Sequence, residues 1–378
     1  MIARAICEEV FRAAVVACDP AVRVREAVAR LVPKTKAVLG VAIGKAALAM
    51  ARGAGPVVRG IAVAPQLDGG PLPLGWTARD AGHPIPDDRS FAAGEAVLEL
   101  VFRATRDDVV LVLISGGASA LVEAPSTQVD RKDFLRLVTE KMKSGAPIEE
   151  LNALRRSLSR IKGGGLAEAC RAPMITLAVS DVIGDELYVI GSGPTVAIPT
   201  GPGRARGAAV RYERLAAHFA RRGDVAEVIA PMRSFAEAAR DALLARGIVL
   251  PFHEEPMRGY VTEIERGIHW GEPTLVVPDD HGEGGRAQQL ALEMARRLRG
   301  SDQCAFVVGS DGVDGPPPVG RPAPAGAYVD GATWDAIGDA VATGALERRD
   351  AGNALAAVGA LVITGPTGIN HADLALVG

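Results

Sequence analysis

The chain has 378 residues, of which 48% are hydrophobic and 23% charged, and its formal net charge is −3. This length suits two globular domains with separate cores, and the composition excludes a disordered chain. The sequence has no block of lysine and arginine, which excludes an extended basic surface, so we expect no nucleic-acid partner. The four cysteines lie far apart without a CxxC pair, which is typical of buried thiols in a reducing compartment.

The first segment of the chain has the apolar content of a secretory signal. Glu8 and Glu9 interrupt it, however, and its apolar residues recur at helical spacing, so we predict a surface helix. No apolar stretch of the sequence reaches the roughly 18 residues that a membrane span requires. We therefore expect a cytoplasmic protein without a membrane partner.

Apolar runs that end in glycine or acidic residues recur along the chain and predict the strands. They lie at 37–45, 60–65, 108–117, 173–181, 226–231, 273–280, 304–312 and 360–368. Helical patterns separate many of them, at 90–104, 233–247, 258–270 and 287–299. Continuous apolar strands that alternate with amphipathic helices predict an α/β fold with mostly parallel sheets covered on both faces.

A change of pattern near residue 255 predicts the domain boundary. Residues 1–255 are expected to form a Rossmann-like α/β domain, and residues 256–378 a smaller α/β domain, each with a mostly parallel sheet flanked by helices. In open α/β sheets, ligands bind beyond the carboxyl ends of the strands. Polar, glycine-rich segments follow six of the predicted strands, so we expect a site assembled from both domains.

Two glycine-containing turns in the first domain each join a strand to a helix. The first, VAIGKAALAMA (41–51), lacks the spacing and the Ser/Thr of a Walker A loop, so Lys45 is interpreted as an anion-binding or charge-stabilising lysine. A solvated surface lysine is the alternative. The second contains Ser115, Gly116 and Gly117, whose exposed N–H groups predict an anion site, with a tight structural turn as the alternative.

The segment SDVIGDELYVIGSGPT (180–195) ends a buried strand in two carboxylates. Asp181 and Asp185 suit Mg²⁺, which prefers one or two carboxylates together with phosphate and water. Helix capping explains one of these aspartates but not both. Upstream, Lys162 adjoins a run of glycines that allows close approach of a phosphate, although a charged helix face is the alternative.

The second domain carries Arg286 at the start of a predicted helix, in GEGGRAQQLAL (282–292). Its guanidinium can hold a carboxylate or a phosphate through two hydrogen bonds. The same segment is only a loose GxGxxA, and no acidic residue ends the next strand at the right distance, which disfavours a dinucleotide site. SDGVDGP (310–316) and TGPTGIN (364–370) add acidic groups and donors that suit phosphate.

Eight motifs, taken in order, resemble the glycerate 2-kinase family, whose C-terminal part is called the MOFRL domain. They are AGHPIPDD (81–88), ISGGASAL (114–121), LSRIKGGGLA (158–167), SDVIGDELYVIGSGPT, GGRAQQLAL, SDGVDGP, AGAYVD (325–330) and TGPTGIN, and the likeness spans residue 37 to the C-terminus. The resemblance implies a MOFRL-type C-terminal domain. It also implies phosphorylation of D-glycerate at its 2-hydroxyl to 2-phosphoglycerate, with ATP and Mg²⁺, in a cleft between the two domains.

The resemblance also implies roles for particular residues. The functional lysine of the family falls on Lys45 and its arginine on Arg286. Its acidic and amide positions fall on Glu272, on Asp311 or Asp314, and on Asn370. We expect Lys45, Arg286 and Asp181 to be catalytic, and Asp181 and Asp185 to bind metal. The predicted cofactor-binding residues are Ser115, Gly116, Gly117, Lys162, Gly163, Gly164, Glu272, Asp311, Asp314, Thr367, Gly368 and Asn370.

These residues suggest a mechanism of phosphoryl transfer. Arg286 would bind the substrate carboxylate or the transferring phosphoryl group, and Lys45 would neutralise charge on the γ-phosphate. Asp181 and Asp185 would hold Mg²⁺ or orient the attacking hydroxyl, while the glycine-rich loops at 115–117 and 364–368 would cradle the nucleotide phosphates.

The chain departs from the family pattern at Ala118, Ser157, Ala287 and His371, where the family usually has glycine, histidine, asparagine and valine. A pocket that loses hydrogen-bonding partners changes its substrate preference, so a kinase for another small hydroxy acid, such as a four-carbon aldonate, is the first alternative. An NAD(P)H-dependent hydroxypyruvate reductase and a ligand-binding paralogue without activity are the others. A homodimer is expected only as the commonest oligomer.

Overall fold

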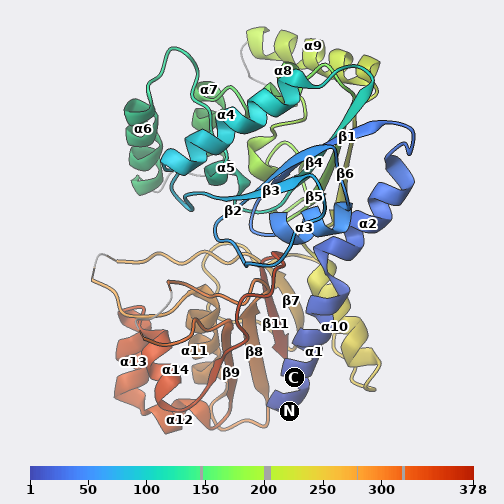
Figure 1. Cartoon of the computed structure of the whole chain (residues 1–378). Helices are drawn as coiled ribbons and strands as arrows, with labels where there is room; N and C mark the ends of the chain where they lie inside the picture. The colour runs from blue at the N-terminus through green and yellow to red at the C-terminus, as the bar shows by residue number, and fades with distance from the viewer. Residues whose placement is uncertain (145–147, 200–205, 279, 317–319) are drawn as a thin grey trace. The chain divides into compact units, whose positions relative to one another are not determined.

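The structure is a computed structural model that describes residues 1–144, 148–199, 206–278, 280–316 and 320–378 (Figure 1). The helices are α1 (Arg4–Ala17), α2 (Pro20–Leu31), α3 (Ala47–Ala54), α4 (Asp88–Arg103), α5 (Ala118–Leu121), α6 (Arg131–Lys143), α7 (Ile148–Leu158), α8 (Gly165–Ala169), α9 (Arg206–Arg222), α10 (Ser234–Leu244), α11 (Arg286–Leu298), α12 (Thr333–Ile337), α13 (Asp339–Glu347) and α14 (Ala351–Ala357). The strands are β1 (Ala37–Ile43), β2 (Arg59–Ala64), β3 (Trp76–Asp80), β4 (Asp108–Ile114), β5 (Met174–Val179), β6 (Val225–Ala230), β7 (Gly267–Gly271), β8 (Cys304–Gly309), β9 (Gly326–Asp330), β10 (Leu361–Val362) and β11 (Asp373–Val377). Among the described residues, no helix has the length and apolar character that crossing a membrane demands.

The chain divides into two compact units. One unit is Pro20–Pro231, and the other combines Met1–Asp19 with Met232–Gly378. This division differs from the predicted domains 1–255 and 256–378, because the first helix and α10 belong to the unit that contains the C-terminal sheet. We call the two units the N-terminal unit (Pro20–Pro231) and the C-terminal unit.

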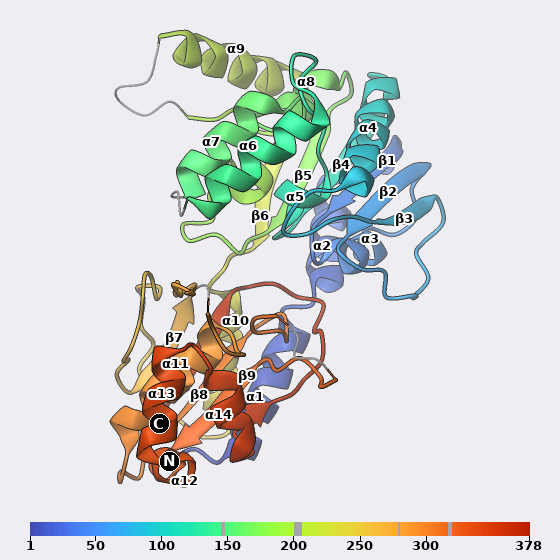
Figure 2. The ribbon, with the colours of Figure 1, turned by 90° about the vertical axis from the view of Figure 1, so that its left-hand side faces the viewer.

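Aromatic packing explains why α1 and α10 belong to the C-terminal unit. The Phe11 ring on α1 lies edge-on to Phe235 of α10 at 5.5 Å and to Phe306 of β8 at 6.4 Å, measured between ring centroids. Cys304 and Gly378 exchange two backbone hydrogen bonds, of 2.8 and 3.0 Å. Both the first helix and the last residue are therefore fixed against the same strand, a contact that local sequence pattern does not reveal. Figure 2 shows α1 and α10 side by side.

The N-terminal unit contains a six-stranded sheet in the order β3-β2-β1-β4-β5-β6, and all neighbouring strands are parallel, as predicted. Alternate residues of the central strand β4 enter two cores. Val110 and Val112 pack with α4, α8 and α9, whereas Leu111 and Leu113 pack with α2 and α3. Burial on both faces accounts for the continuous apolar runs in the sequence.

The C-terminal unit contains a five-stranded sheet in the order β10-β9-β8-β11-β7. The prediction of a mostly parallel sheet was wrong here, because every pairing between these named strands is antiparallel. Helices α11 to α14 cover one face, where Ala305 and Val307 lie, and Phe306 points to α1 on the other. A strand buried on both faces is continuously apolar whatever its direction, so the apolar run could not distinguish the two cases.

Two predicted elements of the C-terminal unit differ from the structure. Residues 258–266 form no helix, and residues 267–270 belong to β7, whose last residue, Gly271, pairs with Met257. No strand occurs in the described part of 273–280. Gly259 and Gly267 adopt positive φ angles of 65° and 153°, which a continuous helix does not allow.

Candidate active site

Lys45 lies where β1 ends, beside the loop that follows the neighbouring strand β4. Its N–H donates to the carbonyl of Gly116 (2.9 Å), and the N–H of Ala46 donates to Oγ of Ser115 (3.0 Å). Gly44 allows this contact, because a Cβ at that position would lie 2.2 Å from the Ser115 hydroxyl oxygen. The structure therefore brings the predicted lysine and the predicted glycine loop together.

The loop after β4 presents backbone donors beside Lys45. Gly117 has a φ of 83°, and the N–H groups of Gly116 and Gly117 have no acceptor within the described parts of the chain. A Cβ built on Gly117 would lie 2.9 Å from His83 Nε2 and 3.6 Å from Lys45 Cγ. Open N–H groups next to a lysine favour an anion. His83 was not among the predicted site residues, and its place in the AGHPIPDD motif was the only signal for it in the sequence.

We call Lys45, Ser115, Gly116 and Gly117 the lysine cluster. It lies at the carboxyl ends of β1 and β4, and β5, which ends in the predicted acidic segment, is the next strand of the sheet. Parallel strands place these three ends at one edge, which is where open α/β sheets bind ligands. The sheet order thus explains why motifs distant in sequence converge.

Asp181 and Asp185 flank the bend after β5, and both side chains are half-buried. The Asp185 N–H donates to the carbonyl of Val182 (3.0 Å), and its φ of 55° is one that aspartate tolerates. Within the described residues, no three His, Cys, Asp or Glu side chains are grouped to hold a metal ion. Two carboxylates still fit Mg²⁺, whose other ligands are commonly phosphate oxygens and water.

Lys162 is placed differently from the predicted phosphate contact. Its side chain is 1% exposed, and its ammonium forms an ion pair with the fully buried carboxylate of Glu123. Burial lowers the pKa of Lys162, and the charge of Glu123 opposes that shift. The N–H groups of Gly163 and Gly164 donate to the carbonyls of residues 192–193, at 3.0 and 2.7 Å, so they are already engaged. This segment therefore holds two loops together.

In the C-terminal unit, the register of the antiparallel strands gathers charged residues at one edge. Asp373, the first residue of β11, lies between Gly271 of β7 and Gly309 of β8. Arg286, which begins α11, donates to Asp373 from Nε (2.7 Å) and Nη2 (3.2 Å), and to Glu272 from Nη1 (2.5 Å). We call Arg286, Glu272 and Asp373 the arginine cluster.

Arg286 keeps donors for a ligand. A guanidinium has five N–H groups, and its three bonds to Glu272 and Asp373 leave two without an acceptor in the described chain. Its side chain is 33% exposed. Burial alone lowers the pKa of Arg286, but Asp373 and Glu272 outweigh it and raise the pKa above its ordinary value. Arg286 thus stays charged and can hold one carboxylate or phosphate.

Asp373 was not among the residues predicted from the sequence. This residue is almost fully buried, and burial raises the pKa of its carboxyl to about 7 although Arg286 opposes the shift. Its carboxylate orients the guanidinium through two bonds, which leaves the outward N–H groups in a defined direction. Its position three residues after Asn370 was the only signal in the sequence.

Because the pKa of Asp373 is raised in the folded protein, the free energy of unfolding is predicted to depend on pH. Because the folded protein binds this proton more tightly than the unfolded chain does, the stability of the wild type is expected to increase as the pH falls from 7.5 to 5.5. Relative to Asp373→Asn, the gain should be about 2 kcal/mol. Urea unfolding of both proteins at the two pH values measures it, and parallel pH profiles would contradict the assignment.

Asp314 has a structural role that differs from the predicted cofactor contact. Its carboxylate accepts the N–H groups of Ala287 (3.0 Å) and Gln288 (2.8 Å) and the side-chain amide of Gln288 (2.9 Å), which caps α11. Burial raises the pKa of Asp314, and these donors oppose the shift. Because its oxygens are engaged, Asp311 is the better candidate of the two acidic residues.

Asp311 lies at the same edge as the arginine cluster. A Cβ built on Gly309 would lie 3.4 Å from Oδ1 of Asp311 and 3.6 Å from Oδ1 of Asp373. The Thr367 N–H donates to the carbonyl of Asp311 (3.1 Å), which holds the 364–370 segment against this turn. Asn370 is buried at the end of that segment. The predicted residues of the second domain, Asp314 aside, thus occupy one region.

The four departures from the family pattern lie in different surroundings. Ala118 and Ala287 are buried small residues at the first position of α5 and the second position of α11, beside residues of the lysine and arginine clusters. His371 is buried beside Asn370. Ser157 is exposed on α7, where its hydroxyl donates to the backbone of its own helix. The substrate preference is therefore expected to depend on Ala118, Ala287 and His371 more than on Ser157.

Comparisons with known proteins place the chain in a family. The family model described as a domain of unknown function, DUF4147, matches residues 6–221, and the model of the MOFRL family matches residues 267–373. The D-glycerate 2-kinase of Thermotoga maritima is 32% identical over 411 residues, which cover 97% of this chain and 96% of that protein. The glycerate 2-kinase of Pyrococcus horikoshii is 32% identical over 379 residues, covering 87% and 84%.

A solved structure extends the similarity to the fold. The crystal structure of glycerate kinase from Thermotoga maritima matches with a TM-score of 0.81 at 29% identity, covering 99% of this chain and 98% of that chain. The first family model alone covers more than half of the chain. The chain therefore belongs to the glycerate 2-kinase family, with a DUF4147 region followed by a MOFRL region.

Proposed function

We propose that the protein is an ATP-dependent kinase that phosphorylates D-glycerate at its 2-hydroxyl and releases 2-phosphoglycerate. The observation that carries this proposal is the lysine cluster, in which a lysine adjoins open backbone donors at the carboxyl ends of parallel strands. Relatives named as glycerate kinases support it. The proposal assigns residues of both units to one reaction in the cell cytoplasm.

In the proposed reaction, Lys45 and the N–H groups of Gly116 and Gly117 bind the γ-phosphate and stabilise the charge that spreads over its oxygens during transfer. The two outward N–H groups of Arg286 hold the glycerate carboxylate and thereby orient the 2-hydroxyl. The hydroxyl oxygen forms a bond to the γ-phosphorus as the bond to the β-phosphate oxygen breaks.

The hydroxyl proton needs an acceptor, and the carboxylates after β5 provide one. One of Asp181 and Asp185 takes the proton, and together they would hold Mg²⁺, which supplies neutralisation of phosphate charge when bound. Asp311 offers a further carboxylate in the C-terminal unit. Lys162 and Asp314 have no part in this scheme, because their charged groups are already paired inside the fold.

The direct test is ADP release by the purified protein with Mg-ATP and a panel of C3–C6 hydroxy acids that includes both enantiomers of glycerate. NMR of the product locates the phosphate. Turnover on D-glycerate to 2-phosphoglycerate is expected. Turnover on a different acid alone would favour the second candidate, a kinase for another hydroxy acid, which the buried alanines at 118 and 287 make chemically reasonable. Oxidation of NADH with hydroxypyruvate, without ADP release, would replace the kinase proposal by the reductase.

Replacement of Lys45 by methionine is expected to lower kcat about 100-fold, because the γ-phosphate loses its nearest cation in the transition state. Stability should change little, since the side chain is exposed. Lys34→Met, at an exposed lysine before the other end of β1, is the matched control and should keep its activity. Steady-state kinetics with Mg-ATP measures kcat for both variants, and equal values would remove Lys45 from the mechanism.

A further inference from the structure

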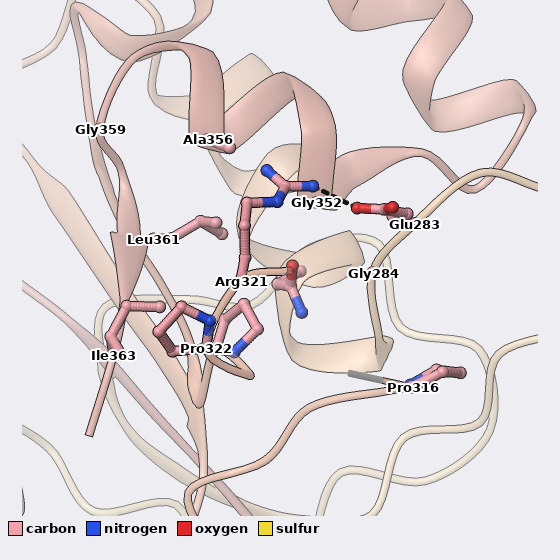
Figure 3. Close-up of a pocket in the computed structure, with 12 residues that line it drawn as sticks. Glu283, Gly284, Pro316, Arg321, Pro322, Gly352, Ala356, Gly359, Leu361 and Ile363 are labelled. Carbon is pink, nitrogen blue, oxygen red and sulfur yellow. Dashed lines mark hydrogen bonds and ion pairs between the residues drawn. The ribbon is translucent and has the colours of Figure 1, made fainter. Parts of the chain in front are cut away.

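The C-terminal unit contains a cavity of about 340 Å³ that the mechanism above does not use. This volume is in the range of roughly 300–1,000 Å³ that small-molecule sites occupy. Its walls are mainly apolar and come from α14, β10 and the proline-containing segment before β9, namely Pro322, Pro324, Ala356, Leu361 and Ile363 (Figure 3). Such walls suit a flat, uncharged group.

One buried polar side chain lines the cavity with an acceptor to spare. Gln288 is 1% exposed, and its Nε2 donates to the carboxylate and to the backbone carbonyl of Asp314, both at 2.9 Å. These two bonds fix the orientation of the amide. Its Oε1 receives no donor from the described residues. The cavity thus offers an oriented oxygen to a ligand that carries an N–H group.

The charges at the rim balance one another. Arg321 forms an ion pair with Glu283, which Figure 3 shows across the cavity, and it also donates to Oδ1 of Asn353 (3.0 Å). Because the guanidinium is already neutralised, the cavity has no net positive charge to attract an anion. A neutral aromatic base fits it better than a phosphate or a carboxylate does.

A donor-rich segment continues directly from the cavity wall. Leu361 and Ile363 line the cavity, and the next residues, 364–368, contain Gly365 and Gly368 with φ angles of 72° and 77°. The N–H groups of both glycines have no acceptor in the described chain, and a Cβ at either would meet open space. An apolar cavity with an open backbone loop at its edge matches a base attached to phosphates.

We propose that this cavity seats the adenine base of ATP, with Oε1 of Gln288 accepting a hydrogen bond from the 6-amino group and the 364–368 segment carrying the phosphates. The inference rests on the proposed kinase function and specifies where its nucleotide binds. Guanine carries an oxygen at position 6, which repels the Gln288 acceptor, so adenine nucleotides are preferred.

Calorimetric titration of the full-length protein with ADP and with GDP tests the proposal. Ala356→Trp fills the cavity and is expected to raise the Kd for ADP at least about tenfold, because the base and the indole compete for one volume. Ala357→Trp puts the same side chain on the exposed face of α14 and should leave the Kd unchanged. In kinetics, Ala356→Trp should raise the KM for ATP with little change in the KM for the acid.

Two further variants keep the test decisive if Ala356→Trp does not fold. Ile363→Asp places a carboxylate at an exposed position of the cavity and should also weaken ADP. Gln288→Met should reduce the preference for ADP over GDP. If the cavity variants bind ADP with the same Kd as the wild type, the assignment of the adenine site to this cavity is overturned and the kinase proposal stays intact. A wild-type protein that neither binds ADP nor turns over would overturn the kinase proposal itself.

Discussion

Replacement of Arg286 by alanine is expected to lower kcat/KM for the hydroxy acid about 1,000-fold, the largest loss of activity we predict. Two effects add. The substrate loses its two charge-assisted hydrogen bonds, and the carboxylate of Glu272, which Arg286 now neutralises, is left to repel the substrate anion. Arg286→Lys should recover only part of the loss, because an ammonium cannot satisfy two carboxylates and a bidentate ligand together.

The measurement must separate a substrate contact from a structural ion pair. Steady-state kinetics should be run with urea unfolding on Arg286→Ala and on the double variant Arg286→Ala/Asp373→Asn. The double variant removes the buried carboxyl group that has lost its cation, so it should regain stability while its activity stays low. Arg296→Ala, in the last turn of the same helix, is the control and should be active. Recovery of activity in the double variant would show that Arg286 only neutralises Asp373.

The fold of the N-terminal unit could be predicted because its strands and helices alternate along the chain. Six strands of the sheet are parallel, and the apolar runs at β1, β2, β4, β5 and β6 were predicted from their composition. The strand β3 (WTARD) was missed, because most of its residues are exposed and it contains no apolar run. The antiparallel pairing of the second sheet was missed for another reason. The direction of a strand depends on the long connections around it, and a strand buried on both faces has the same apolar sequence in either direction.

In the candidate site, too, some residues could be predicted from the neighbouring sequence, and others depend on partners far away in the chain. Glycines that permit a close approach, such as Gly44 and Gly117, mark their loops in the sequence because the local backbone requires them. Asp373 is different, because its partner Arg286 is 87 residues away and meets it only through the register of β11. Roles that depend on such pairings cannot be read from a motif.

Lys162 is the clearest case in which the local motif and the fold predict different experiments. A lysine beside three glycines predicts a phosphate contact, whereas the structure pairs it with Glu123, 39 residues upstream, in a position closed to solvent. From this pairing, Lys162→Met should lower the free energy of unfolding by about 3–5 kcal/mol, because it leaves a buried carboxylate without its cation. A phosphate contact would instead raise the KM for ATP and leave stability unchanged.

The partner variant makes the distinction quantitative. Glu123→Gln keeps the acceptor for the Ala124 N–H (2.9 Å) but removes the negative charge. The buried ammonium of Lys162 then has no counter-charge, so this single variant should destabilise the fold by a similar amount. In the double variant neither charge is buried alone, so its loss of stability should be smaller than the sum of the two single losses. Lys141→Met, at an exposed ion pair with Glu150, should cost less than about 1 kcal/mol. Additive losses in the double variant would mean that Lys162 and Glu123 do not depend on each other, and the predicted phosphate contact would then be the better account of Lys162.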